Sequence, residues 1–138
     1  MGSNTGIMKK LLIALAAMGV LAAPASATAK SPLEGRWKKG NLVIRISPCG
    51  RDLCGTVIRA SAKQKERAER GSGTDLIGAR LIEDIDQTGP NTYRGSVFLP
   101  DKNMRARGTI RQVSPNQLAV KGCILGLICK TQTWHRVR

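Results

Sequence analysis

The sequence predicts an all-β protein: a small antiparallel barrel of about eight strands, preceded by a cleavable signal peptide. Two observations lead to this fold class. After residue 27 the chain consists of short apolar and β-branched runs, separated by turns that contain Gly, Pro, Asn and Asp. No helical pattern alternates with these runs, which argues against a parallel α/β sheet. Closing an antiparallel meander into a barrel removes the unpaired edges that promote aggregation.

Residues 1–27 have the composition of an export signal. Two lysines precede an apolar run at 11–23, and Ala-x-Ala ends the segment. We predict cleavage after this motif, with residues 1–7 as a non-native or wrongly assigned extension and 28–138 as a single barrel domain. A retained anchor helix is the alternative, but the apolar run is shorter than the about 20 residues that span a bilayer. The predicted location is the periplasm or the exterior of the cell.

The predicted mature chain is strongly basic. The whole sequence has a net charge of +14, and removal of two lysines with the signal leaves 21 basic and nine acidic residues, a net charge of +12. For an exported protein, this charge points to anionic lipid, polysaccharide or an acidic protein as a partner, unless it is only a solvated surface. Nucleic acid is not expected, because the four aromatic residues provide few stacking platforms.

Four cysteines remain after the signal, and an even number in an exported domain predicts disulfides. Cys49 and Cys54 flank one short turn, and Cys123 and Cys129 flank another. We therefore expect the local pairs Cys49–Cys54 and Cys123–Cys129, while a pairing across the two turns remains open. No metal site is expected, because the spacing differs from that of zinc knuckles and His135 is the only histidine.

The segments between turns are assigned as follows. Residues 60–74 are charged and lack an apolar stripe, so we expect an exposed loop with at most one helical turn. Residues 76–85 have a spacing that tolerates a helix, but Gly78 and the neighbouring segments favour a strand. The predicted strands are 33–38, 42–46, 53–59, 76–85, 92–99, 104–113, 118–123 and 130–137.

Alternation along the strands separates an inner from an outer face. In 104–113, Met104 and Ile110 fall on one side, whereas Arg105, Arg107 and Arg111 fall on the other. These three arginines are a candidate anion-binding site. Their alternative role is the solvated outer wall of the barrel.

Short motifs at the two ends of the domain resemble known families. Gly35-x-Trp37, with Arg136 on the last strand, is similar to the lipocalin arrangement, in which a Trp closes one end of an eight-stranded barrel beneath a basic side chain. A longer pattern covers Pro48-Cys49-Gly50, Leu53-Cys54-Gly55, Gly122-Cys123, Leu125-Gly126-x-x-Cys129 and Gln132-Thr133-Trp134-x-Arg136. Over residues 33–137 it resembles the exported bacterial domain of unknown function 2147 (DUF2147).

This resemblance implies a lipocalin-like β-barrel, with Gly35, Trp37 and Arg136 as its structural plug. It implies no established chemistry. The middle of the chain departs from the family pattern: the charged segment 63–70 replaces an Asn-Pro acidic segment, and 92–103 replaces a Trp-x-Gly-Gly block. Ligand contacts in those loops therefore cannot be carried over from relatives.

Catalysis and cofactors are not expected. His135 stands alone, and a lone His is more often a surface residue than a general base. Glu83, Asp84 and Asp86 lie in one short segment instead of converging from different elements. No glycine loop that cradles phosphate is present. We therefore predict no enzyme activity, no catalytic residues and no cofactor.

Two hypotheses for the function remain. The first is a carrier that binds a small apolar or amphipathic ligand in the barrel, with lumen residues Trp37, Tyr93, Val97, Met104 and Trp134 as candidate contacts. The second is a basic envelope module that binds anionic lipid, polysaccharide or an acidic protein through its outer face. A lumen smaller than about 300 Å³ would disfavour the carrier, since ligand pockets are usually larger.

Overall fold

The computed structural model describes residues 30–124 and 126–138. The predicted signal peptide and the 1–7 extension lie outside these residues, so the cleavage site and the domain boundary at residue 28 stay predictions. The described elements are β1 (Gly35–Lys39), β2 (Leu42–Cys49), β3 (Asp52–Arg59), α2 (Ala62–Ser72), β4 (Arg80–Gly89), β5 (Thr92–Leu99), β6 (Met104–Ser114), β7 (Gln117–Ile124) and β8 (Ile128–Val137).

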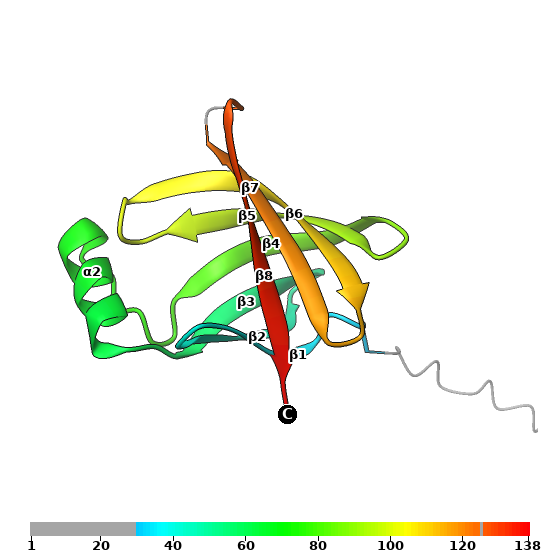
Figure 1. Cartoon of the computed structure of the whole chain (residues 1–138), viewed down its shortest axis with the longest axis horizontal. Helices are drawn as coiled ribbons and strands as arrows, with labels where there is room; N and C mark the ends of the chain where they lie inside the picture. The colour runs from blue at the N-terminus through cyan, green and yellow to red at the C-terminus, as the bar shows by residue number, and fades with distance from the viewer. Residues whose placement is uncertain (1–29, 125) are drawn as a thin grey trace, which may run out of the picture.

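The eight strands form one closed antiparallel barrel, in which each strand pairs with its neighbours along the chain. The barrel closes between β1 and β8, which lie side by side (Figure 1). In this pairing Trp37 lies opposite Arg136. No strand edge is left unpaired in this closed order. The prediction of an all-β, eight-stranded antiparallel barrel is confirmed.

The inner face of the barrel is apolar, as the alternation predicts. Ile110 on β6 and Leu118 on β7 are each 1% exposed, whereas Arg105, Arg107 and Arg111 on β6 are exposed. The core also contains Leu33, Trp37, Ile44, Ile46, Val57, Ile82, Ile85, Tyr93, Val120 and Trp134. Burial of these side chains is the main favourable contribution to folding of the barrel.

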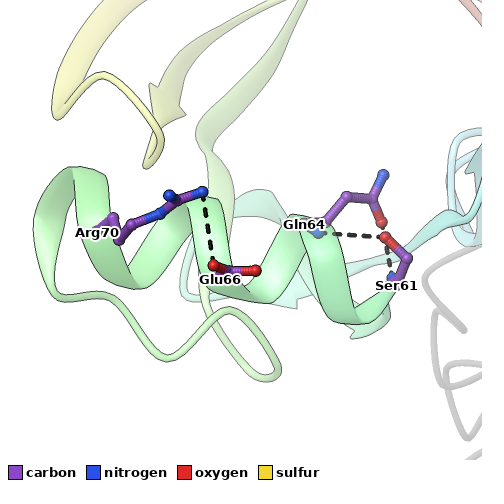
Figure 2. Close-up of polar contacts among 4 residues, drawn as sticks. All are labelled: Ser61, Gln64, Glu66 and Arg70. Carbon is purple, nitrogen blue, oxygen red and sulfur yellow. Dashed lines mark hydrogen bonds and ion pairs between the residues drawn. The ribbon is translucent and has the colours of Figure 1, made fainter.

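The charged segment 60–74 is not a loop, and this prediction is wrong. It contains α2, a helix of 11 residues that starts from a capping box. Figure 2 shows this box: the Gln64 backbone N–H donates to Ser61 Oγ at 3.2 Å, and Ser61 N–H donates to Gln64 Oε1 at 2.8 Å. Gly73 ends the helix with φ of 66°. Helix caps of this kind are visible in sequence as Ser-x-x-Gln, a signal that the missing apolar stripe obscured.

The predicted strand 76–85 begins later than expected, at Arg80, and extends to Gly89. Gly78 has a φ of 87°, a backbone conformation that breaks a strand. Its N–H donates to the Val57 carbonyl at 2.8 Å, so the segment before β4 is a turn held against β3. The other strands differ from prediction mainly at their ends.

The cysteines form the two local pairs. Cys49–Cys54 joins the ends of β2 and β3, and Cys123–Cys129 joins the ends of β7 and β8. Because β2 runs away from the β1–β2 turn and β7 runs toward the β7–β8 turn, the two disulfides lie at opposite ends of the barrel. Each of them fixes a turn.

Candidate functional site

One end of the barrel is closed by Trp37. Its side chain is 0% exposed, and its Nε1 donates to the Leu33 carbonyl at 2.8 Å. The guanidinium carbon of Arg136 lies 4.2 Å from the centroid of the Trp37 ring. An indole with a guanidinium on its face fills the tapered end of a small barrel and attracts the cation through the ring quadrupole.

Arg136 also links the segments that surround this end. Its Nε donates to the Pro115 carbonyl at 2.9 Å, its Nη1 to the Glu34 carbonyl at 2.9 Å and its Nη2 to the Pro32 carbonyl at 2.7 Å. Gly35 leaves room for this arrangement, since a Cβ at that position would lie 2.6 Å from Arg136 Nη1. The three predicted plug residues are therefore brought together at this end of the barrel.

The other end of the barrel opens into a cavity of about 640 Å³. This volume lies within the range of about 300–1,000 Å³ that is usual for ligand pockets. The deep wall of the cavity is predominantly apolar and is formed by inward-facing side chains of several strands: Leu42, Ile44, Leu81, Ile82, Val97, Ala106, Val120 and Trp134. The lumen is thus not filled by its own side chains.

The mouth of the cavity is basic. Its lining includes four cationic side chains: Lys39 near the β1–β2 turn, Arg67 on α2, Lys102 in the β5–β6 turn and Lys130 on β8. Asp101 is the single carboxylate in this lining. Burial, and then the charge of Lys130, lower the pKa of Lys39 below its ordinary 10.5. An anion at the mouth would relieve this repulsion.

Helix α2 lies at this end of the barrel, next to the β5–β6 turn (Figure 1). Gln64, Arg67 and Ala68 of the helix line the cavity, and Ala68 is 1% exposed. At Gly71 the helix lies directly against the backbone of the β5–β6 turn, where a Cβ would collide with the Asp101 and Pro100 carbonyls. The absence of a side chain at Gly71 therefore sets how closely α2 approaches this turn.

The five predicted ligand contacts divide into two groups. Val97 and Trp134 line the cavity, whereas Trp37, Tyr93 and Met104 do not. Trp134 Nε1 is buried and has no hydrogen-bond partner within the described residues. An unpaired buried donor costs about 1–3 kcal/mol, so this indole N–H is a polar group that the fold itself leaves unused.

Sequence reasoning missed the basic mouth and the contribution of α2. Lys39 and Lys130 are far apart in the chain, and they share one cavity because β1 and β8 close the barrel. The capping box at Ser61 and Gln64 was the available signal for the helix. No local pattern marks the lysines as a group.

The predicted anion site on β6 lies on the outer wall and not at the mouth. Arg105 is engaged locally, since its Nη1 lies 3.8 Å from Glu83 Oε2 and its guanidinium carbon lies 4.9 Å from the Phe98 ring centroid. Arg107 and Arg111 are exposed. These arginines share one face of one strand, with no cavity between them.

The residues considered for catalysis do not converge. His135 is exposed on β8, and Glu83, Asp84 and Asp86 lie together on β4. Across residues 30–124 and 126–138, no group of three or more His, Cys, Asp or Glu side chains is placed to hold a metal ion. In the same part of the chain, no helix has the length and apolar character needed to cross a membrane.

A closed barrel with one plugged end and one open, apolar lumen is the architecture of lipocalin-like proteins. The sequence profile of a family described as "Uncharacterized protein conserved in bacteria (DUF2147)" matches residues 35–136, and the chain belongs to this family. A comparison with curated proteins gave no match.

Among solved structures, the fold is similar to that of protein HP1028 from the human pathogen Helicobacter pylori, which is described as belonging to the lipocalin family. The TM-score is 0.58 and the sequence identity is 16%, with 80% of this chain and 85% of that chain covered. This likeness establishes the lipocalin-like fold and nothing about the ligand.

Proposed function

We propose that this protein binds a small amphipathic molecule in the barrel, with the apolar part in the lumen and an anionic end at the mouth. The observation that carries the proposal is the cavity of about 640 Å³, whose deep wall is apolar and whose mouth is cationic. The proposed activity is binding and not catalysis. The proposed location is the periplasm or the exterior, as the export signal in residues 1–27 predicts.

The lumen supports the apolar part of this assignment. Side chains such as Ile44, Val97 and Val120 present hydrocarbon to the cavity, and burial of a ligand chain against them is favourable at about 0.8 kcal/mol per CH₂ group. A fully polar ligand would lose its hydration without regaining enough hydrogen bonds in this wall.

The mouth supports the anionic part. Lys39, Arg67, Lys102 and Lys130 surround an opening that contains one acidic side chain, Asp101. A carboxylate or phosphate here would interact with several cations at once while its chain enters the lumen. A cationic headgroup would meet net repulsion.

The test is a calorimetric titration of the purified protein with dodecanoate and with dodecanol, which share the chain and differ in charge. Dodecanoate is expected to bind at least about tenfold more tightly than dodecanol, a difference of about 1.4 kcal/mol. Equal binding of the two would disprove recognition of an anionic headgroup at the mouth but would still support an apolar binding site in the lumen. No binding of either would disprove the carrier.

A pair of variants locates the binding. Ala106→Leu places extra volume in the cavity and is expected to weaken dodecanoate binding about tenfold, because Ala106 lines the lumen. Ala119→Leu on β7 is the matched control: Ala119 lies beside Arg111 in the β6–β7 register and is not part of the cavity lining. Equal losses from both variants would argue against a site in the lumen.

The second candidate, an envelope module, is supported by the outer wall of β5, β6 and β7. Thr109 on β6 lies opposite Arg94 on one side and Lys121 on the other, between the exposed Arg107 and Arg111. This wall has several cations and no cavity. If it binds an anionic surface, the double variant Arg107→Gln/Arg111→Gln weakens that binding and leaves dodecanoate binding unchanged.

A further inference from the structure

The turn between β7 and β8 exposes two large apolar side chains. Leu127 is 87% exposed and Ile128 is 69% exposed, the highest values among the large hydrophobic residues that the structure describes as exposed. We refer to these two residues as the apolar tip. In Figure 1 the β7–β8 turn, coloured orange to red, stands clear of the other turns. Two adjacent exposed hydrophobic side chains with polar surroundings are typical of a site that contacts another surface.

The apolar tip lies in a hairpin whose two strands are joined covalently. The Cys123–Cys129 disulfide closes the turn, and Leu127 N–H donates to the Ile124 carbonyl at 3.2 Å. Gly126 has a φ of 69°, a left-handed conformation that suits glycine in a tight reversal. This local order lowers the entropy that a binding partner would have to remove.

The surroundings of the apolar tip are cationic. Lys121 on β7 and Lys130 on β8 flank it, and Lys39 and Lys102 belong to the same end of the barrel as Lys130. Asp101 is the one carboxylate in the lining of the cavity at this end, against four Lys or Arg side chains. A small apolar tip within a basic surface complements a membrane that carries anionic headgroups.

We propose that Leu127 and Ile128 insert into the headgroup region of an anionic membrane and hold the mouth of the barrel against it. A bilayer is favoured over a protein partner because the tip is narrow and protruding. A specific protein interface buries about 800 Å² on each partner, far more than two side chains supply. A fluid lipid surface accepts such a tip without a shaped pocket.

Docking in this way would bring the cavity to the membrane surface. Ile128 of the apolar tip lines the cavity, as do Ile124 and Lys130 of the same hairpin, whereas Leu127 is not part of the cavity lining. Exchange of an amphipathic ligand with the bilayer then requires no passage through bulk water. This consequence rests on the proposed carrier function, but the docking itself does not.

The experiment is co-sedimentation of the full protein with vesicles of phosphatidylcholine, with and without phosphatidylglycerol. The wild-type protein is expected to bind the anionic vesicles and not the neutral ones. Leu127→Ser is expected to lower the partition coefficient at least about tenfold, because the removed side chain is the most exposed one in the tip. At 87% exposure, the substitution removes no core contact that folding needs.

The matched control is Val113→Ser near the end of β6, at the plugged end of the barrel, where Val113 is 52% exposed. It is expected to leave vesicle binding unchanged. Four results would overturn the proposal: equal losses from the two serine variants, equal binding to neutral vesicles, a stable dimer that Leu127→Ser dissociates, or loss of binding only in Arg107→Gln/Arg111→Gln.

Dodecanoate binding separates this proposal from the carrier function. Leu127→Ser is expected to bind dodecanoate in solution as the wild type does, since Leu127 does not line the cavity. A protein that binds vesicles through the apolar tip but binds no dodecanoate would uphold the docking and refute the carrier. The reverse result would refute the docking alone.

Discussion

At the scale of single residues, the plugged end depends on one guanidinium. Arg136 donates to three backbone carbonyls and covers Trp37, and it thereby ties the last strand to the segment before β1 and to the β6–β7 turn. Arginine suits this role because its donors form a rigid planar fork with fixed directions. A lysine could not reach three carbonyls in different directions.

We predict that Gly35→Ala destabilises the protein by about 3 kcal/mol, from backbone strain and displacement of Arg136. Gly35 has a φ of 131°, and a Cβ there would lie 2.6 Å from Arg136 Nη1. Gly40→Ala is the control: Gly40 has a φ of 58° but open space around it, so about 1 kcal/mol is expected. Urea unfolding measures both, and equal losses would show that the Arg136 contact contributes nothing.

Resemblance and spacing differ in what they predict at this scale. The family motif links Gly35-x-Trp37 near the start of the domain with Arg136 near its end, so it shows that these distant residues lie together in the fold. Local spacing has no such information, which is why Lys39 and Lys130 were not recognised as neighbours. Alternation along 104–113 separated Ile110 from the exposed arginines but could not show which inward residues reach the lumen, where Ala106 lines the cavity and Ile110 does not.

The lysine pair gives a pH-dependent prediction. Burial and the charge of Lys130 lower the pKa of Lys39 in the folded state, so the unfolded chain binds the proton more tightly. The contribution of Lys39 to the free energy of unfolding therefore becomes more favourable as the pH rises from the lowered folded pKa to 10.5. Lys130→Gln is expected to raise the pKa of Lys39 toward 10.5 without reaching it, because burial remains.

Titration of the Lys39 side chain by NMR measures this shift. Lys121→Gln on β7 is the control and is expected to leave the pKa of Lys39 unchanged, since Lys121 is not among the causes of the shift. An unchanged value in Lys130→Gln would mean that the two ammonium groups do not interact at the mouth.

At the scale of elements, strands and helix differ in how far the sequence predicts them. The strands are specified by alternation and turn residues, and both signals are local. Helix α2 has no apolar stripe because it buries little more than Ala68, so its pattern resembles that of a loop. The Ser61–Gln64 capping box stabilises its first turn, and the exposed pair of Glu66 with Arg70, 3.7 Å apart, adds little (Figure 2).

We predict that Gly71→Ala moves α2 away from the β5–β6 turn, because a Cβ at this position collides with the Asp101 and Pro100 carbonyls. Backbone atoms cannot rotate aside as a side chain can, so the helix must shift. The expected results are a lower melting temperature and faster amide exchange across α2, measured by mass spectrometry. Gly89→Ala, with no atom near its Cβ, should change neither.

At the scale of the whole molecule, the two ends of the barrel differ in structure. The end with Trp37 and Arg136 is closed and hydrogen-bonded, and the end with Lys39 and Lys130 is open and charged. A closed sheet allows this division because its strands fix both ends at once while the turns vary independently. Rigidity in the plug and access at the mouth are therefore compatible.

The disulfides test this division, since there is one at each end and they close loops of similar length, with sequence separations of 5 and 6. Chain entropy predicts that removal of either pair costs about 2 kcal/mol of stability. Replacement of Cys49 and Cys54 by Ala should leave dodecanoate dissociation unchanged. Replacement of Cys123 and Cys129 should alter it, because Ile124 and Ile128 of that hairpin line the cavity. Stopped-flow displacement measures the rates, and equal rates in both variants would show that the β7–β8 turn does not control the mouth.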